Sequence, residues 1–155
     1  MKKAIAESRT VQTRLVLPAD TNHIGTMFGG KVLAYIDEIA AIAAMKHAGS
    51  IVVTASIDSV DFVSSARTGD VLQLEAVVTY TGTTSMEVYV RVTANNLIAE
   101  REQLTTESFL TMVAVDEAGK PVEVPDVFPE TPEEIRLHET APARKKNRIR
   151  RAKLR

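Results

Sequence analysis

Hydrophobic and polar positions along the chain predict one long buried helix. Residues 31–47 (KVLAYIDEIAAIAAMKH) show no strand-like alternation and are rich in helix formers, and Gly49 supplies a stop signal. Apolar side chains form two stripes on this helix, with Leu33, Ile36, Ala40 and Ala43 in one and Val32, Ile39 and Ile42 in the other. Because a helix that is apolar on both flanks is buried on most sides, we expect it to lie in the core.

Other segments combine β-branched or aromatic residues with partial alternation, which is typical of strands. They are residues 10–17, 51–62, 71–80, 85–93 and 106–115. The last four follow one another through short connections, which favours an antiparallel sheet. About five antiparallel strands and one buried helix predict an α+β domain in which the sheet wraps around the helix.

The remaining segments are rich in turn formers and prolines. Residues 18–30 (PADTNHIGTMFGG) predict a loop that leads into the helix, and residues 122–128 an extended connection. Thr131 and Pro132 then favour a second helix, as its cap and first residue, with acids in the first turn. We therefore divide the chain into a domain over 8–125 and a C-terminal extension over 126–155 with a helix and a basic tail.

The composition is that of an ordinary globular domain. The chain has 155 residues, of which 45% are hydrophobic and 25% charged, and this length corresponds to about one domain. No apolar run approaches the roughly 20 residues of a membrane-spanning helix, and the first residues (MKKAIAE) lack the apolar stretch of a secretory signal. We expect a cytoplasmic protein without membrane insertion. Cysteine is absent, which excludes disulfides, a thiolate nucleophile and cysteine metal sites.

The net charge of −1 conceals a basic C-terminal end. Residues 144–155 contain eight Lys or Arg residues and no acid, so the other 143 residues carry a net charge of −9. Such a run can bind phosphates, nucleic acid or an anionic membrane, or it can be solvated or paired with a neighbouring subunit. We expect the last two alternatives, because neither interleaved aromatics nor a base-reading fold indicates specific nucleic-acid binding.

Common enzyme motifs are absent from the chain, which has no nucleophile elbow, P-loop, dinucleotide fingerprint or HExxH. The three histidines are scattered, so no metal site is expected. One unusual feature is the pair Gly29-Gly30, directly before the long helix. A helix start has unpaired N–H groups and partial positive charge, and glycines there admit a ligand whose oxyanion these groups would stabilise. The alternative is that the two glycines only form a tight turn from the loop into the helix.

A second unusual feature is Asp37-Glu38, two acids in the middle of the most apolar helix. A charge buried there is costly unless it is paired, hydrogen-bonded or facing a cavity. Asp37 lies about two turns, or roughly 10 Å, beyond Gly30 and could share a cleft with the helix start. The structural alternative is that Glu38 is solvated and that Asp37 lies, hydrogen-bonded, at a subunit interface.

These residues resemble a known family. Residues 18–37 (PADTNHIGTMFGGKVLAYID) are similar to the signature of hot-dog-fold acyl-CoA thioesterases, closest to the group that includes the cytosolic and brain acyl-CoA hydrolases. Residues 52–62 (VVTASIDSVDF) resemble the strand after the helix in that group, and Gly69-Asp70 and residues 83–88 (TTSMEV) also match. The resemblance covers about residues 8–117.

The resemblance implies a hot-dog fold, a homodimer with sheets joined edge to edge, and further assembly as a trimer of dimers, a hexamer. It implies hydrolysis of acyl-CoA to fatty acid and CoA, with CoA as part of the substrate and no separate cofactor. The family's catalytic aspartate falls on Asp37 and its loop asparagine on Asn22, which would share a site from opposite protomers. The backbone of Gly29 and Gly30 would polarise the thioester carbonyl.

Recognition of the anionic CoA calls for basic and polar groups near the mouth of the cleft. Candidates are Arg67, Thr83, Thr84 and Ser85, together with Arg91 and residues 144–155.

The chemistry leaves two mechanisms open. A thioester carbonyl is electrophilic, so Asp37 would act either as general base on water or as a nucleophile that forms a mixed anhydride. Asn22 would orient the water or hydrogen-bond the carbonyl. Two other functions compete, a hot-dog acyl-thioester dehydratase that would use His23, and a non-catalytic acyl-CoA-binding or regulatory module.

Overall fold

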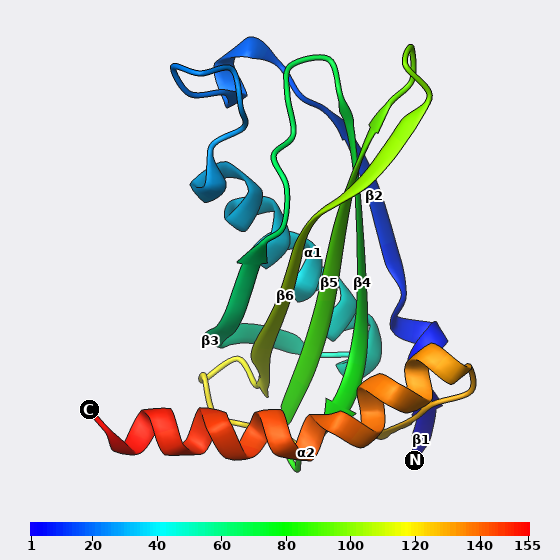
Figure 1. The fold of residues 1–155 in the computed structure, drawn as a ribbon. Helices are drawn as coiled ribbons and strands as arrows, with labels where there is room; N and C mark the ends of the chain where they lie inside the picture. Colours follow the sequence, from blue (N-terminus) through cyan, green and yellow to red (C-terminus); the bar gives the residue numbers. More distant parts are fainter.

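The long helix α1 (Gly29–Ala48) packs across one face of a five-stranded antiparallel sheet (Figure 1). The structure is a computed structural model and describes residues 1–155. The strands are β2 (Thr10–Leu15), β3 (Ile51–Phe62), β4 (Val71–Thr81), β5 (Ser85–Asn96) and β6 (Arg101–Val115), in the spatial order β2-β4-β5-β6-β3. The predicted α+β architecture is confirmed, and β2 and β3 form the two edges of the sheet.

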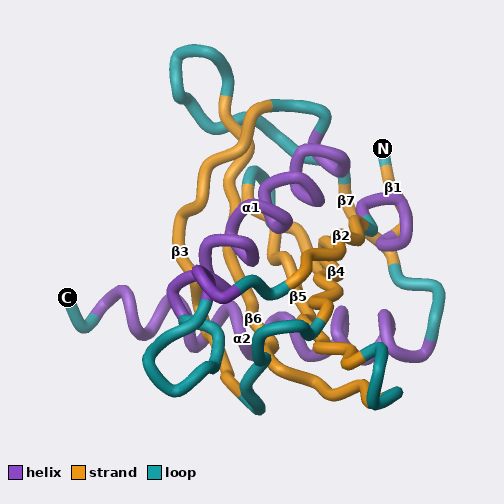
Figure 2. Tube along the Cα trace, turned by 90° about the horizontal axis from the view of Figure 1, so that it is seen from above, coloured by secondary structure: helices purple, strands orange, loops and turns teal.

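The core lies between α1 and the inner face of the sheet, and Figure 2 shows the helix lying over the strands. Every second residue of β4 is buried along most of its length, as expected for a strand with one face on the core. The helix contributes Ile36, Ile39, Ala40, Ala43 and Ala44, all without exposed surface. Alanines at these positions let the helix approach the sheet closely, which brings side chains of α1 within reach of the edge strand β3.

Three elements are longer than their hydrophobic patterns predict. Helix α1 begins at Gly29 rather than at residue 31. Strands β5 and β6 continue as a hairpin in which Asn96 pairs with Arg101, whereas the pattern predicts ends at residues 93 and 106. The added hairpin residues are mostly polar and are held by backbone pairing, so no apolar alternation marks them.

The N-terminal residues also pack on the domain. Strand β1 (Lys2–Ala4) pairs in parallel with β7 (Asp126–Phe128), which forms the end of the predicted extended connection. A short 3-10 turn, η1 (Ile5–Ser8), follows β1, and a second one, η2 (Pro18–Asp20), opens the loop before α1. Ile5 is fully buried, and the Ser8 hydroxyl accepts a hydrogen bond of 2.8 Å from the Val78 N–H.

Helix α2 (Pro132–Lys153) crosses the outer face of the sheet, opposite α1 (Figure 1). Its predicted start is confirmed, because the Thr131 hydroxyl accepts a hydrogen bond of 3.2 Å from the Glu134 N–H. The basic run continues this helix, and Arg144 and Arg151 form ion pairs with the sheet, so these two residues are not part of the solvated tail that we expect from the sequence. Neither α1 nor α2 is long and apolar enough to cross a membrane.

Candidate active site

The loop before α1 is closed by the side chain of Asn22. Its Oδ1 accepts hydrogen bonds from the N–H groups of Ile24 (3.0 Å) and Thr26 (3.2 Å), and its Nδ2 donates to the Thr26 hydroxyl at 2.9 Å. The Asn22 N–H also donates to the Thr26 carbonyl at 2.8 Å. Asparagine suits this turn because its amide mimics backbone groups. The loop therefore holds Asn22 in a fixed position close to the helix start.

The first turn of α1 has free donors. Its cap, Phe28, makes no side-chain cap hydrogen bond, and the N–H groups of Gly29 and Gly30 donate no hydrogen bond within the protomer. A Cβ atom on Gly30 would meet nothing within 4 Å, whereas one on Gly29 would lie 3.2 Å from Cζ of Phe62. Gly29 thus allows the end of β3 to approach the helix, and Gly30 presents open backbone. These donors, at the positive end of the helix dipole, can bind a carbonyl oxygen that gains negative charge.

A cavity of about 300 Å³ lies beside this helix start. Six of its eleven lining residues are hydrophobic, among them Met27, Val32 and Phe62, and Gly29 forms part of its wall. Small-molecule sites are commonly apolar hollows with a few polar groups that fix the ligand's orientation. The combination here suits an apolar chain that ends in a polarisable carbonyl.

Asp37 lies two turns further along α1 and is half-buried. Its Oδ1 accepts a hydrogen bond of 2.7 Å from the hydroxyl of Thr54 on β3, and its Oδ2 makes no hydrogen bond within the chain. The same hydroxyl lies 3.4 Å from Sδ of Met112, at the edge of the core. One carboxylate oxygen is therefore held in place and the other is available to take a proton or to attack.

Glu38 has a different environment from its neighbour. It forms an ion pair of 3.2 Å with Arg14 on β2, and 54% of its side chain is exposed. A 100° turn per residue separates the two acids around the helix, so only Asp37 faces β3. Glu38 is therefore a surface residue, which agrees with the structural alternative for this acid.

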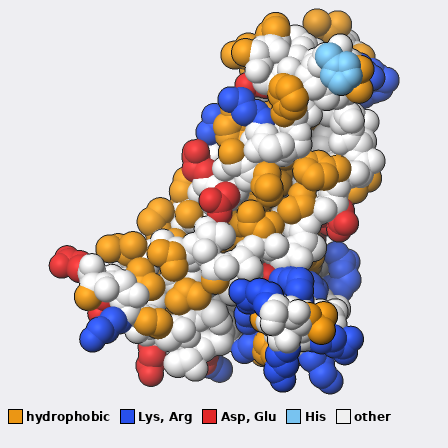
Figure 3. Space-filling model, turned by 90° about the vertical axis from the view of Figure 1, so that its left-hand side faces the viewer, with side chains coloured by type: hydrophobic (Ala, Val, Ile, Leu, Met, Phe, Trp, Pro, Cys, Tyr) orange, Lys and Arg blue, Asp and Glu red, His pale blue; other side chains and the backbone are white.

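Strand β3 is an edge strand with exposed apolar side chains. Ile51, Val53 and Phe62 are 53%, 48% and 57% exposed. Figure 3 looks onto this side and shows hydrophobic side chains across it, with Lys and Arg side chains gathered around the end of α2. A long apolar edge of this kind is usually paired with another strand, because its free N–H and C=O groups otherwise promote aggregation.

The other predicted site residues lie at two ends of the protomer. Arg67 forms an isolated backbone bridge with Thr26, which places it beside the Asn22 loop. Thr83 lines a surface hollow together with Ala48, the last residue of α1. Because the twenty residues of α1 span roughly 30 Å, one protomer does not bring Thr83 near Gly29. Thr84 and Ser85 belong to the same turn as Thr83, and Ser85 lies beneath α2.

The sequence pattern does not single out Thr54, although its hydroxyl hydrogen-bonds to the carboxylate of Asp37. It lies in a strand rich in Ser, Thr and Val, where a hydroxyl carries no signal of its own. Alternation from Ile51 places Thr54 on the inner face together with Val52, but its partner on that face depends on how α1 crosses the sheet.

Comparison with known proteins identifies the family. Residues 24–98 match the thioesterase superfamily. The chain is 51% identical over 147 residues to the "uncharacterized acyl-CoA thioester hydrolase YkhA" of Bacillus subtilis, covering 93% of this chain and 86% of that protein. It is 32% identical over 142 residues to the cytosolic acyl coenzyme A thioester hydrolase of Rattus norvegicus, covering 90% of this chain but only 37% of the rat protein.

Solved structures agree with this comparison. An apo-hexameric acyl-CoA thioesterase superimposes with a TM-score of 0.97 at 71% identity over 99% of both chains. The acyl-CoA hydrolase of Staphylococcus aureus, in complex with butyryl coenzyme A, coenzyme A and coenzyme A disulfide, superimposes with a TM-score of 0.94 at 50% identity, over 98% of this chain and 93% of that chain. The chain belongs to the hot-dog-fold acyl-CoA thioesterase family, as the resemblance implies.

The Staphylococcus aureus hydrolase has also been solved as single alanine variants of an asparagine, an aspartate and a threonine. Along that chain the three residues have the same spacing as Asn22, Asp37 and Thr54 have along this one.

Proposed function

We propose that this protein hydrolyses acyl-CoA thioesters to a free fatty acid and CoA. The observation that carries the proposal is the carboxylate of Asp37, anchored through one oxygen by Thr54 and free at the other. The open donors of Gly29 and Gly30 beside an apolar cavity supply the second requirement of the reaction, a site for the carbonyl oxygen. Membership of the acyl-CoA thioesterase family and the CoA-bound structure of the Staphylococcus aureus relative support the choice of substrate.

The complete site is formed by two protomers. Groups that polarise and attack one carbonyl must lie within about 3–3.5 Å of its atoms. Gly29 and Asp37 are eight residues apart on one helix, which corresponds to roughly 12 Å of rise, so a single chain cannot apply both to one thioester. The partner protomer must therefore supply one of the two groups.

The exposed β3 edge indicates how the partner supplies it. Phe62, at the end of β3, lies against Gly29 of the same chain. Antiparallel pairing of two β3 edges about a two-fold axis brings the end of one strand to the start of the other, and so carries Gly29 and Asn22 of one protomer toward Thr54 and Asp37 of the other. Twelve residues of strand, with apolar side chains half exposed, support a stable homodimer. The hexameric relative supports assembly of three such dimers.

In this dimer, the thioester carbonyl accepts hydrogen bonds from the helix start while Asp37 acts on the carbonyl carbon. As general base, Asp37 takes a proton from water, the resulting hydroxide bonds to the carbonyl carbon, and the C–S bond breaks to release CoA thiolate, which is then protonated. As nucleophile, Asp37 forms a mixed anhydride that water hydrolyses in a second step. Asn22 orients the water or the carbonyl. Neither route needs a cofactor.

The nucleotide end of CoA is anionic and requires polar and basic contacts at the mouth of the cleft. Arg67 beside the Asn22 loop fits this requirement from one protomer. The Thr83, Thr84 and Ser85 turn lies at the opposite end of α1 and would approach the same site only across the dimer.

The test is thiol release from acyl-CoA substrates of increasing chain length by the purified protein. Steady, enzyme-dependent release at one or more lengths is expected. Binding without turnover would identify an acyl-CoA-binding module, and loss or gain of enoyl absorbance would identify a dehydratase. His23, which the dehydratase would need, is exposed and makes no hydrogen bond within the chain, so the structure does not favour that alternative.

A further inference from the structure

The edge strand β3 is irregular at the point where it supports the site. Its register against β6 shifts twice, once at Ala55 and once at Asp58, and each shift is a β-bulge with an extra residue on β3. Thr54 faces α1 and reaches Asp37, whereas the bulge at Ala55 turns Ser56, two residues further on, to the outer side of the sheet. In a regular strand these two side chains would lie on the same face. The bulge at Ala55 thus lets Thr54 face Asp37 while Ser56 and Asp58 face the outer side of the sheet.

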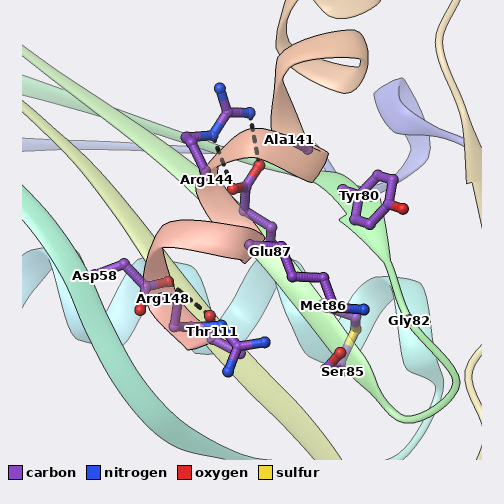
Figure 4. Close-up of a pocket in the computed structure, with 11 residues that line it drawn as sticks. Asp58, Tyr80, Gly82, Ser85, Met86, Glu87, Thr111, Ala141, Arg144 and Arg148 are labelled. Carbon is purple, nitrogen blue, oxygen red and sulfur yellow. Dashed lines mark hydrogen bonds and ion pairs between the residues drawn. The ribbon is translucent and has the colours of Figure 1, made fainter. Parts of the chain in front are cut away.

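The outer side of this bulged segment is held by the carboxylate of Asp58. It accepts hydrogen bonds from the hydroxyls of Ser56 and Thr111, both at 2.6 Å, and from Nη2 of Arg151 at 2.9 Å. Nη1 of Arg151 also donates to the Asp58 carbonyl at 3.3 Å. Only 15% of the Asp58 side chain is exposed, and Figure 4 shows it joined to Thr111 beneath α2. The Asp58 carboxylate thus hydrogen-bonds to Ser56 of its own strand, to Thr111 of β6 and to Arg151 of α2.

Arg151 lies at the far end of α2, in the basic run that the proposed reaction leaves without a function. Charge-assisted hydrogen bonds to a carboxylate are short and directional, and the guanidinium here contacts both the side chain and the backbone of the bulge. Arg150 and Lys153 lie in the same turns, are exposed, and form no ion pair within the chain. The basic character of the helix end alone therefore does not explain the contact.

We propose that Arg151 and Asp58 form a clamp by which the last turns of α2 fix the bulges of β3 and so hold the Thr54 hydroxyl on Asp37 for catalysis. Both are positioning residues, since neither contacts the reacting atoms. The inference rests on the proposed thioesterase function, because it assigns these residues a part in that reaction. The clamp gives α2 a part in catalysis, although this helix lies on the outer face of the sheet, opposite α1.

The first experiment compares thiol release by Arg151→Ala with release by Arg136→Ala, a variant of an exposed arginine of α2 that forms no ion pair and lies outside the basic run. We expect kcat of Arg151→Ala to fall about tenfold with KM nearly unchanged, because small displacements of a catalytic group are costly in rate. Arg136→Ala should behave like the wild type, and Arg151→Lys, which keeps one charged donor, should recover part of the loss. Equal kcat values for the two alanine variants would overturn the proposal.

The second experiment asks whether the clamp acts through Thr54. If it does, Arg151→Ala should have no further effect on kcat in a Thr54→Val background, since the contact it maintains is already lost. Full additivity of the two losses would show that Arg151 acts by another route. Light scattering at the assay concentration should give the same particle mass for all variants, so that a loss of dimer is not mistaken for a loss of positioning.

Hydrogen–deuterium exchange separates the clamp from the proposed function. Arg151→Ala should speed exchange in peptides that cover residues 54–59, and Arg136→Ala should not. Unchanged exchange in that segment contradicts the clamp even if the wild type releases thiol from acyl-CoA. A wild-type protein that releases no thiol contradicts the proposed function and the clamp's catalytic purpose together.

Discussion

The hydroxyl of Thr54 donates a hydrogen bond of 2.7 Å to Oδ1 of Asp37, and this contact joins the edge strand β3 to the central helix. Thr54 is exposed in the protomer, so the contact lies on the surface that we propose a second protomer covers. Burial of that surface in the dimer would strengthen the hydrogen bond and exclude water from Asp37 except where the substrate enters. In the proposed dimer, the carboxylate of Asp37 and the β3 edge therefore belong to one structural unit.

Replacement of Asp37 by asparagine should abolish most of the activity. Loss of a catalytic carboxylate typically lowers the rate by roughly 10² to 10⁴. We expect that fall in kcat with an unchanged fold, because asparagine is nearly isosteric and can still accept from Thr54. The control is Glu38→Gln, which removes an exposed acid paired with Arg14 and should lose much less. Near-normal thiol release by a folded Asp37→Asn protein would show that Asp37 has a structural and not a catalytic function.

Thr54→Val should lower kcat by about tenfold to a hundredfold, since a hydrogen bond to a charged group contributes roughly 1.5–3 kcal/mol. Valine preserves the shape and β-branching of the side chain, so the strand should remain intact. The variant tests the anchor of Asp37 apart from the aspartate itself. Thiol release at saturating substrate gives kcat, and circular dichroism checks the fold. A kcat within twofold of the wild type would show that Asp37 needs no anchor.

Mixed dimers test whether Asn22 and Asp37 act across the interface. Asn22→Ala and Asp37→Ala proteins should each be nearly inactive alone. When equal amounts are refolded together, about half of the dimers are mixed, and two-fold symmetry gives each mixed dimer one site with both lesions and one with neither. The mixture should then recover about a quarter of wild-type activity. Verified mixed dimers without recovery would contradict the cross-protomer site but not the hydrolase function.

The ion pair of Arg144 with Glu87 should be important for stability. Arg144 donates to both carboxylate oxygens, at 2.8 and 2.9 Å, and the two side chains are only 24% and 12% exposed. Arg144→Ala leaves Glu87 without its cation and should lower the free energy of unfolding by about 3 kcal/mol. The exposed pair of Arg9 with Glu75 provides the control, since Arg9→Ala should cost less than about 1 kcal/mol. Urea unfolding at one protein concentration measures both. Equal losses would show that the buried pair is no more important than the exposed one.

His47 should make the fold less stable in acid. It is fully buried, its Nε2 lies 2.6 Å from the Pro125 carbonyl, and its Nδ1 has no partner. Burial lowers the pKa of this imidazole below 6.5. A depressed histidine pKa means that the unfolded chain takes up a proton near pH 6.5 while the folded chain does not. Stability is therefore complete above about pH 6.5 and falls below it, by up to about 1.4 kcal/mol per pH unit.

His47→Gln is the variant that isolates this effect. Its amide can still donate to the Pro125 carbonyl but does not titrate. The free energy of unfolding, measured with urea at pH 5.5 and 7.5, should fall less in this variant than in the wild type as the pH is lowered. The same fall in both proteins would show that other groups govern the acid response.

The hydrophobic pattern by itself determined the main elements of this protein. It places β3 at residues 51–62, the limits that the structure shows, and α1 within two residues of its observed start. Helix α1 buries a regular set of apolar side chains, and β3 is a run rich in β-branched residues, so both signals are local properties of the chain. An acid in the apolar helix likewise indicates a special environment at Asp37, because an unpaired charge there would be costly.

Only the tertiary structure decided what holds Asp37 and what the basic end of the chain does. The contact of Thr54 with Asp37 joins residues 17 positions apart, and that of Arg151 with Asp58 joins residues 93 apart. Neither follows from periodicity, because alternation gives the face on which Thr54 lies but not its partner on α1, and because a run of arginines looks the same whether solvated or docked. A bulge is defined by the register of one strand against its neighbour, so it exists only once the sheet has formed.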